Sequence, residues 1–435
     1  MAAFSLDPEQ STWCAELRAL AAEHLRPIAE KGAPGRVNRP LVAALGAHGL
    51  IARLFDSGAL DLCLMRESLA RACTEAETAL ALQGLGAHPI AARGTPAQRA
   101  RWLPEVTAGR AVAAFALSEP GAGSDAAALA LEAVPERGTG TRAGRGGDAS
   151  GAGWRLYGEK CWISNAPEAD VVTVFARTGE SGRGARGVTA FLVPGDRPGL
   201  GGEPLDMLAP HALGTLVFDG VRVGPEDVLG EPGHGFRVAM HTLNLFRPSV
   251  GAFAVGMAQA ALDATLAHTA ARPAFGGVLA DLQSVAHQVA EMATRTEAAR
   301  LLVYAAAEAY DRGAPDVPRR AAMAKLLATE TAQYVVDAAV QLHGARALQR
   351  GHLLEHLYRE VRAPRIYEGA TEVQRTIIAK ELYRAAADAG AATGATAPGP
   401  DSAPGPDSGP GPETAPGRPS PFDGAPVSVP TGGSS

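Results

Sequence analysis

The first part of the chain has apolar residues at three- and four-residue spacing, and its other positions are rich in Ala, Glu and Arg. This spacing places apolar side chains on one face of a helix. The pattern extends over about residues 11–108, and Leu17, Leu20, Ala21 and Leu25 are one example of it. It predicts an all-helical first domain over residues 1–110.

From Ala111 the pattern changes to short apolar runs bounded by turn residues, which is typical of β-strands. The expected strands cover residues 112–117, 154–164, 171–176, 188–193 and 215–223. These runs predict a middle β domain over residues 111–226. Between two of them, residues 137–153 are dense in Gly and Arg. Without aromatic or helix-terminal context, this segment favours a solvent loop over a phosphate site.

The helical period returns in residues 227–386, which predict a helical C-terminal domain. Helices are expected at about 236–269, 319–343 and 371–386. The clearest apolar seam, typical of a helix packed in a bundle, consists of Leu282, Val285, Val289, Met292, Thr296, Ala299, Val303, Ala306 and Tyr310. Residues 387–435 are mostly Gly, Pro, Ala, Ser, Thr and Asp, and they predict a disordered tail because they cannot bury enough apolar surface to offset chain entropy.

The composition limits the possible partners. At 435 residues with 46% apolar content, the chain is long enough for several domains with sizeable cores. A net charge of -6 without basic, aromatic-rich runs argues against nucleic acid. The four cysteines are scattered, which favours neither a metal site nor disulfides. We expect a cytoplasmic protein that does not enter a membrane, because we find neither an export segment nor an apolar run of spanning length.

Glu368 is a candidate general base. It precedes a predicted helix start at which Thr371 and Gln374 match a capping box. Its apolar neighbours Ile366 and Tyr367 would leave the carboxylate poorly solvated and therefore more basic. On this segment alone, an exposed carboxylate stabilised by the helix dipole is the stronger interpretation.

Residues 115–126 contain a Gly-x-Gly-x-x-Ala string after an apolar strand. A nicotinamide-binding fold is disfavoured, because Ser118, Glu119 and Pro120 separate the strand from the glycines and the strands do not alternate with helices. The glycines would instead let the backbone and the hydroxyls of Ser118 and Ser124 approach a flat or extended ligand. An ordinary Gly-rich turn is the alternative.

A second cluster covers residues 158–166. Trp162 and Ser164 alternate with Ile163, so they are expected on one face of a strand. An aromatic ring and a hydroxyl on one face suit a planar heteroaromatic ligand. A core tryptophan with an unrelated serine is an equally good interpretation of this cluster by itself.

The order of these segments resembles the acyl-CoA dehydrogenase family over nearly the whole chain, up to about Arg384. The matching segments are 115–125, 158–165, 228–240, 272–283 and 341–382. The resemblance implies an α+β multidomain fold: an N-terminal helical domain, a middle β-barrel domain and a C-terminal four-helix bundle. It also implies a non-covalently bound FAD and a homotetramer, with a homodimer as the alternative.

The resemblance also assigns roles to residues. Glu368 matches the catalytic base, and Arg247, Tyr367, Gly369 and Ser124 match the substrate side. Cofactor-binding matches are Leu117, Ser118, Gly123, Trp162 and Ser164, together with Arg272, Phe275, Gln283, Gln341 and Gly344, which would reach the cofactor of a neighbouring subunit. The chain departs from the family pattern at Ala345, Ala347 and Ala370, where added or missing side-chain atoms would alter cofactor contacts.

The implied reaction is α,β-dehydrogenation of an acyl thioester to the trans-2-enoyl thioester. Glu368 would remove the α proton while the β hydrogen leaves as hydride to the flavin. The acyl group would arrive on CoA or on an acyl carrier protein, and an electron-transfer flavoprotein would accept the electrons. A flavin-dependent oxidase or monooxygenase on the same fold is the alternative, and a cofactor-free scaffold is a different class.

Overall fold

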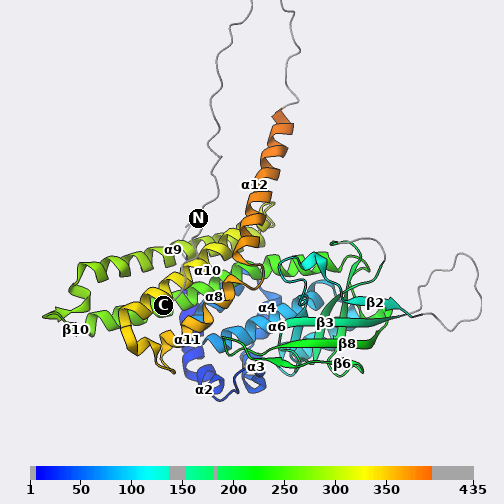
Figure 1. Cartoon of the computed structure of the whole chain (residues 1–435), viewed down its shortest axis with the longest axis horizontal. Helices are drawn as coiled ribbons and strands as arrows, with labels where there is room; N and C mark the ends of the chain where they lie inside the picture. The colour runs from blue at the N-terminus through cyan, green and yellow to red at the C-terminus, as the bar shows by residue number, and fades with distance from the viewer. Residues whose placement is uncertain (1–5, 137–152, 180–183, 394–435) are drawn as a thin grey trace, which may run out of the picture. The chain divides into compact units, whose positions relative to one another are not determined.

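The computed structural model describes residues 6–136, 153–179 and 184–393. Residues Met1–Ala386 form one compact unit, and Ala387–Ser435 form a second. The first unit begins with helices and continues into a sheet and then into long helices (Figure 1). The predicted helix, strand, helix order is therefore confirmed.

The N-terminal region is helical, as the apolar spacing predicts. Capping boxes begin two of its helices, with Asp7 and Gln10 at the first and Thr95 and Gln98 at the last. The helices are α1 (Pro8–Leu20), η1 (Ala21–Leu25), α2 (Arg26–Ala29), α3 (Arg39–Ala47), α4 (Leu50–Asp56), α5 (Ala59–Ala72), α6 (Thr74–Arg93) and α7 (Pro96–Thr107).

The described residues of the middle region form one nine-stranded sheet. Its strands are β1 (Ala113–Ala116), β2 (Glu132–Pro135), β3 (Trp154–Ser164), β4 (Val171–Arg177), β5 (Val188–Pro194), β6 (Leu200–Gly201), β7 (Pro204–Leu205), β8 (Leu213–Val223) and β9 (Val228–Leu229). The five predicted strands are confirmed within a few residues, but β2 and the two-residue strands were not predicted. The two-residue strands are too short to give an alternating pattern. Most of the predicted Gly- and Arg-rich loop lies outside the described residues.

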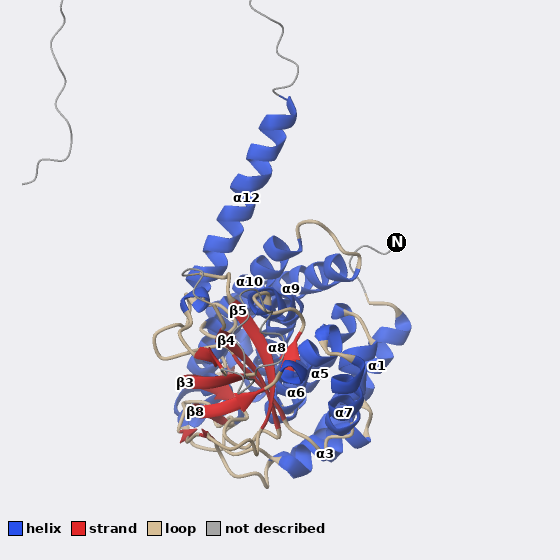
Figure 2. Cartoon of the chain, turned by 90° about the vertical axis from the view of Figure 1, so that its right-hand side faces the viewer, coloured by secondary structure: helices blue, strands red, loops and turns tan. Residues whose placement is uncertain are grey.

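The sheet packs against helices from both flanking regions. Strand β1 pairs in parallel with β4, and helix α6 contacts both strands. The start of helix α8 (Gly235–Ala271) shares a small core with β4 and β5. Figure 2 shows the strands gathered beside α6 and α8. No helix of normal length follows β1, since only the 3-10 turn η2 (Ala126–Ala128) comes after it, and this agrees with the rejection of a nicotinamide-binding fold.

The C-terminal region contains three long helices that pack on one another: α8, α9 (Gln283–Asp311) and α10 (Val317–His343). Helix α5 of the N-terminal region also packs on α8, which joins the two helical regions in one core. The hairpin β10 (Pro273–Ala274) and β11 (Gly277–Val278) joins α8 to α9. After α10 come η5 (Gly344–Leu348), α11 (Leu353–Glu360), η6 (Ala363–Arg365) and α12 (Thr371–Thr393).

Two sequence predictions need correction. Helix α12 continues to Thr393, so the tail predicted to be disordered from 387 begins as helix; residues 394–435 lie outside the described part of the chain. The alanines among residues 387–392 still favour helix, and the Gly- and Pro-rich composition begins only later. Helix α8 is long and apolar enough to cross a membrane, contrary to our expectation, but 72% of its most apolar window is buried inside the protein. This burial is what a core helix shows.

Candidate active site

Glu368 lies in the loop between η6 and α12, and its backbone is strained. Its φ angle is +52°, in the left-handed region that non-glycine residues rarely adopt, and Gly369 follows with φ +95°. Such strain costs on the order of 1–3 kcal/mol and persists only where surrounding contacts impose it. The contacts of this loop should therefore show what holds Glu368 in this conformation.

Three side chains hold the two carbonyl groups of Glu368 and Gly369. Arg247 Nε donates to Glu368 O at 3.3 Å, and Gln374 Nε2 donates to Glu368 O at 3.1 Å and to Gly369 O at 2.8 Å. Lys325 Nζ donates to Gly369 O at 2.7 Å. Lys325 and Gln374 are fully buried and Arg247 nearly so, which makes these hydrogen bonds hard for water to replace.

Glu330 of α10 fixes both ends of the same loop. Its Oε1 accepts from Thr371 Oγ1 at 2.7 Å and from Arg365 Nε at 3.0 Å. The predicted capping box of Thr371 and Gln374 is therefore wrong. The Gln374 N–H donates instead to the Ala370 carbonyl at 3.0 Å. The Thr371 side chain binds Glu330, and the Gln374 side chain binds the loop carbonyls.

The Glu368 carboxyl group is poorly solvated. Its Oε2 atom is buried and has no hydrogen-bond partner among the described residues. Burial raises the pKa of Glu368 above its usual value, and the charges of Arg66, Lys325 and Arg247 oppose that rise. The interpretation as an exposed carboxylate is therefore wrong, and Glu368 remains a candidate general base because such a base needs a raised pKa.

Arg66, which sequence reasoning missed, provides the first of these opposing charges. It lies on α5 with its side chain 4% exposed, and it forms an ion pair with the fully buried Glu77 of α6. Its Nη1 donates to Ser249 Oγ on α8 at 2.7 Å. Tyr367 is 37% exposed as a whole, but desolvation of its hydroxyl raises the pKa of Tyr367, and Arg66 is the first charge that opposes the rise. The charge of a buried ion pair thus acts on the loop that carries Glu368.

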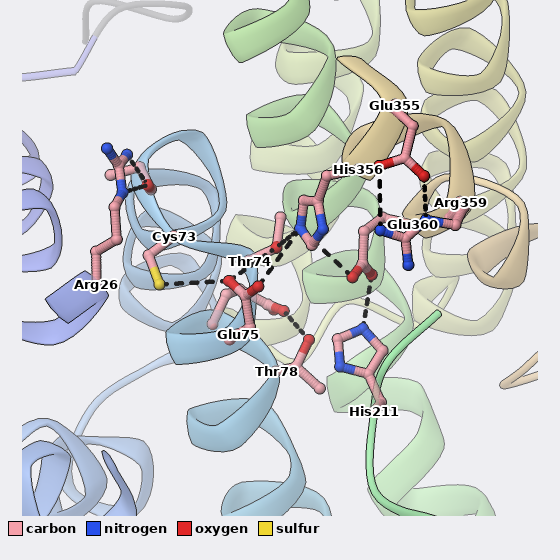
Figure 3. Close-up of polar contacts among 12 residues, drawn as sticks. Arg26, Cys73, Thr74, Glu75, Thr78, His211, Glu355, His356, Arg359 and Glu360 are labelled. Atoms are coloured by element: carbon pink, nitrogen blue, oxygen red, sulfur yellow. Dashed lines mark hydrogen bonds and ion pairs between the residues drawn. The ribbon is translucent and has the colours of Figure 1, made fainter. Parts of the chain in front are cut away.

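A further polar cluster joins the start of α6 to α11 (Figure 3). His211, from the loop between β7 and β8, contacts Glu360 Oε2 through Nε2 at 2.6 Å. His356 lies between Glu360 and Thr74, with its Nε2 2.6 Å from Thr74 Oγ1. The charge of Glu360 also contributes to the raised pKa of Tyr367. This side of the site is therefore polar.

The segment after β1 is held in place by a second buried ion pair. Lys160 Nζ lies 2.7 Å from Glu119 Oε1 and donates to Leu117 O at 3.0 Å. The Glu119 carboxylate also accepts from the backbone N–H groups of Ala130 at 2.6 Å and Leu131 at 2.9 Å. Burial lowers the pKa of Lys160 to about 8. These contacts fix a loop in which Leu117 is buried, Ser118 is half-buried, and Gly123 and Ser124 are exposed.

Trp162 and Ser164 lie at the end of β3, beside this loop, where Cys161 N donates to Ser118 O at 3.0 Å. Trp162 is 47% exposed and Ser164 is half-buried, so Trp162 is not a core tryptophan. The strand is not regular here, contrary to the simple alternation we expected. The register shifts between Lys160 and Ile163, and Trp162 has φ +57°. This bulge turns the indole outward.

The remaining predicted cofactor residues lie elsewhere. They are all exposed, and they occupy the hairpin β10–β11 and the adjoining helix ends: Arg272, Phe275, Gln283, Gln341 and Gly344. Phe275 is 90% exposed and has φ +51°. Figure 1 shows β10 at the opposite end of this unit from β2 and β3. One chain therefore does not bring these residues together with Trp162.

The three alanines that depart from the family pattern differ in how far they are buried. Ala347 is fully buried within the helical core, so its methyl group packs inside the protein and not against a ligand. Ala345 is exposed and Ala370 is half-buried. Within residues 6–136, 153–179 and 184–393, no group of three or more His, Cys, Asp or Glu could hold a metal ion.

Comparison with known proteins shows the family. The acyl-CoA dehydrogenase N-terminal, middle and C-terminal domains match residues 7–110, 114–221 and 233–383. A probable acyl-CoA dehydrogenase, fadE25 of Mycobacterium leprae, is 36% identical over 392 residues, which cover 88% of this chain and 97% of that protein.

Two solved structures have the same fold. Butyryl-CoA dehydrogenase from Megasphaera elsdenii matches with a TM-score of 0.79 and 31% identity over 87% of this chain and 99% of that chain. PigA with FAD and proline matches with a TM-score of 0.78 and 27% identity over 87% of this chain and 98% of that chain. With all three domains matched in order, the chain belongs to the acyl-CoA dehydrogenase family.

Proposed function

We propose that this protein binds FAD and catalyses α,β-dehydrogenation of an acyl thioester, with Glu368 as the base. The observation that carries the proposal is the Glu368 carboxyl group, which has a buried, unpartnered Oε2 and lies on a strained loop held by buried donors. A carboxylate of this kind is costly to keep unless it has a function.

The residues around Trp162 suit a flavin. The exposed indole offers a stacking face, and the half-buried Ser164 hydroxyl can make a polar contact beside it. A Cβ on Gly123 would meet no atom within 4 Å, so this glycine leaves open space next to the loop for a ligand. When bound, the flavin would accept a hydride from the β carbon of the substrate.

Glu368 would remove the α proton of the thioester. Poor solvation makes the carboxylate a stronger base, because burial raises the pKa of Glu368 while the charges of Arg66, Lys325 and Arg247 oppose that rise. The donors to its backbone fix its position, so little reorganisation is needed at the moment of proton transfer. By resemblance to the family, the backbone N–H of Glu368 would donate to the thioester carbonyl and stabilise the developing enolate.

The exposed hairpin residues support an assembly of several copies. Arg272 and Phe275 lie at the hairpin β10–β11, and Figure 1 shows β10 at the end of the unit opposite β2 and β3. An exposed phenylalanine in a strained turn is costly in a monomer. We therefore place them against the flavin site of a second copy, in a homotetramer or homodimer. We further propose a CoA or acyl carrier protein thioester as substrate, an electron-transfer flavoprotein as acceptor and a cytoplasmic location.

The test is Glu368→Gln in the flavin-loaded protein. Because general-base catalysis contributes about 100- to 10,000-fold, the rate of flavin bleaching by butyryl-CoA should fall by that factor. The flavin content should not change. The matched control is Glu372→Gln, whose side chain is 78% exposed four residues later. Bleaching of Glu368→Gln at the wild-type rate would refute the assignment, and stoichiometric peroxide formation during turnover in air would favour an oxidase.

A further inference from the structure

Three histidines lie in ring contact next to the hairpin β10–β11. His268, in the last turn of α8, stacks on His343, the last residue of α10, with ring centroids 4.1 Å apart and ring planes 20° apart. His352, the residue before α11, meets His343 edge-on at 5.7 Å. All three residues are half-buried, so this histidine cluster is open to solvent. Rings in such close contact titrate as a coupled group.

Positive charge surrounds the histidine cluster. Arg272 follows His268 by four residues and Arg346 follows His343 by three, and both arginines are exposed. Neither forms an ion pair with any other described residue. Burial lowers the pKa of His268, and so do the charges of His343, Arg346, Arg272 and His352. A proton is therefore costly on this cluster as it stands.

The carboxylates on the neighbouring elements have other partners. Asp281, just after the hairpin, accepts from the backbone N–H of Val278 at 2.8 Å. Glu355 of α11 forms ion pairs with Arg350 and Arg359. An anion from outside the chain would therefore complete the histidine cluster through charge-assisted hydrogen bonds.

The histidine cluster has free ring nitrogens and open space for such an anion. Within the described part of the chain, the ring of His268 forms no hydrogen bond, and His352 uses only Nδ1, which accepts from the Leu354 N–H at 3.1 Å. A Cβ on Gly344 would meet no atom within 4 Å, so the space directly after His343 is open. His268 and His343 both lie at the C-terminal ends of helices, where the helix dipole favours a positive charge.

The neighbouring residues indicate which anion this is. Arg272, which the proposed assembly places against the flavin site of a second copy, adjoins His268. The family resemblance assigns Gln341 and Gly344, on either side of His343, to the same cofactor. Guanidinium and imidazolium donors suit a phosphate ester, and in FAD that group is the diphosphate.

We propose that the histidine cluster, together with Arg272 and Arg346, binds the diphosphate of the FAD at the flavin site of a second copy, and takes up a proton as it does so. A proton on the cluster is costly while only positive charges surround it, and a nearby diphosphate removes that cost. This inference rests on the proposed function and adds binding residues and a pH dependence to the same site.

The experiment measures the dissociation constant of FAD by equilibrium dialysis of the flavin-loaded full chain, between about pH 5.5 and about pH 8, the range in which histidine titrates. The affinity should rise as the pH falls, by up to about tenfold for each pH unit, because uptake of one proton changes the binding constant by that factor. The diphosphate of FAD is a diester and keeps its charge over this range, so the change must come from groups of the protein.

Two variants separate charge from shape. His268→Gln keeps a polar side chain that takes up no proton, so its FAD affinity should change less with pH than that of the wild type. His268→Lys carries its charge throughout and should keep the tighter binding at the alkaline end of the range. The control is His24→Gln/His48→Gln, which removes another pair of histidine rings, 6.1 Å apart in the N-terminal region. It should keep the wild-type affinity and pH dependence.

An FAD affinity that does not change with pH, or a pH dependence that His268→Gln leaves intact, would overturn the inference while leaving flavin binding and dehydrogenation in place. Separation of the subunits over the same pH range, seen in sedimentation velocity, would also overturn it, because the pH would then act on the assembly and not on the diphosphate. Protein that retains no flavin at any pH would overturn the proposed function, and this inference with it.

Discussion

Gly369→Ala is the sharpest test of the base loop. Gly369 has φ +95°, and an added Cβ would lie 2.4 Å from Gln374 Nε2, which must then move. The left-handed backbone costs an alanine about 1–2 kcal/mol. Displacing Gln374 also weakens its two hydrogen bonds to the loop carbonyls, each worth about 1 kcal/mol, so the loop geometry loses roughly 3 kcal/mol.

This change should slow flavin bleaching more than it lowers the stability of the protein. The loop can relax around the new methyl group, but the Glu368 carboxylate then shifts, and a misplacement of about 1 Å costs on the order of 100-fold in rate. We expect flavin bleaching by butyryl-CoA, followed by anaerobic stopped flow, to slow by about that factor. Flavin content should remain that of the wild type.

Gly351→Ala is the matched control. Gly351 also has a positive φ, +86°, but an added Cβ there meets no atom within 4 Å. It should cost about 1–2 kcal/mol of stability and leave the bleaching rate unchanged. If Gly369→Ala bleached as fast as Gly351→Ala, the idea that these contacts position the base would be refuted.

Three further outcomes are expected. Burial raises the pKa of Glu368 and lowers the pKa of Lys325 to about 8. The bleaching rate should therefore rise with pH as Glu368 loses its proton and fall again as Lys325 loses its charge. Lys325→Arg should shift only the alkaline fall, to higher pH. Glu119→Gln leaves Lys160 buried without a counter-charge, so the free energy of unfolding measured by chemical denaturation should fall by about 3–5 kcal/mol. Little change would show that the pair is dispensable. Trp162→Ala should weaken flavin affinity by up to about tenfold, measured by equilibrium dialysis, since one aromatic stacking contact is worth about 0.5–1.5 kcal/mol.

The long elements could be predicted because each carries many repeats of one period. The seam of α9 is an example: Val285, Met292, Thr296, Ala299 and Val303 are all buried, as their spacing predicts. Two-residue strands such as β6 and β9 carry no period, so only pairing with a neighbour defines them.

The site was harder to predict, because its contacts join residues far apart in the chain. Glu368 was a candidate base from its local sequence, but only the family resemblance made that interpretation stronger than an exposed carboxylate. Arg66, Glu77 and Lys325 were missed, although one signal was available. Each is a charged residue at helical spacing from buried neighbours, as Lys325 is from Ala321, Ala322, Ala328 and Thr329. A charge on a core face indicates a buried pair or a site.

Backbone strain gives independent support to the site assignment. Among the described residues, the non-glycine positions with positive φ are Trp162, Asn165, Phe275 and Glu368. Three of them were selected from the sequence as site residues, and the fourth, Asn165, binds the Ala113 carbonyl at 2.8 Å and fixes the end of β3 next to Ser164. Strain of about 1–3 kcal/mol per residue is retained where it orients functional groups. Phe275 is strained and 90% exposed, so its own chain gives it little reason for this conformation. In the proposed assembly a second copy would cover Phe275 and so provide that reason. Phe275→Ala should therefore weaken assembly in sedimentation velocity without speeding unfolding of the subunit.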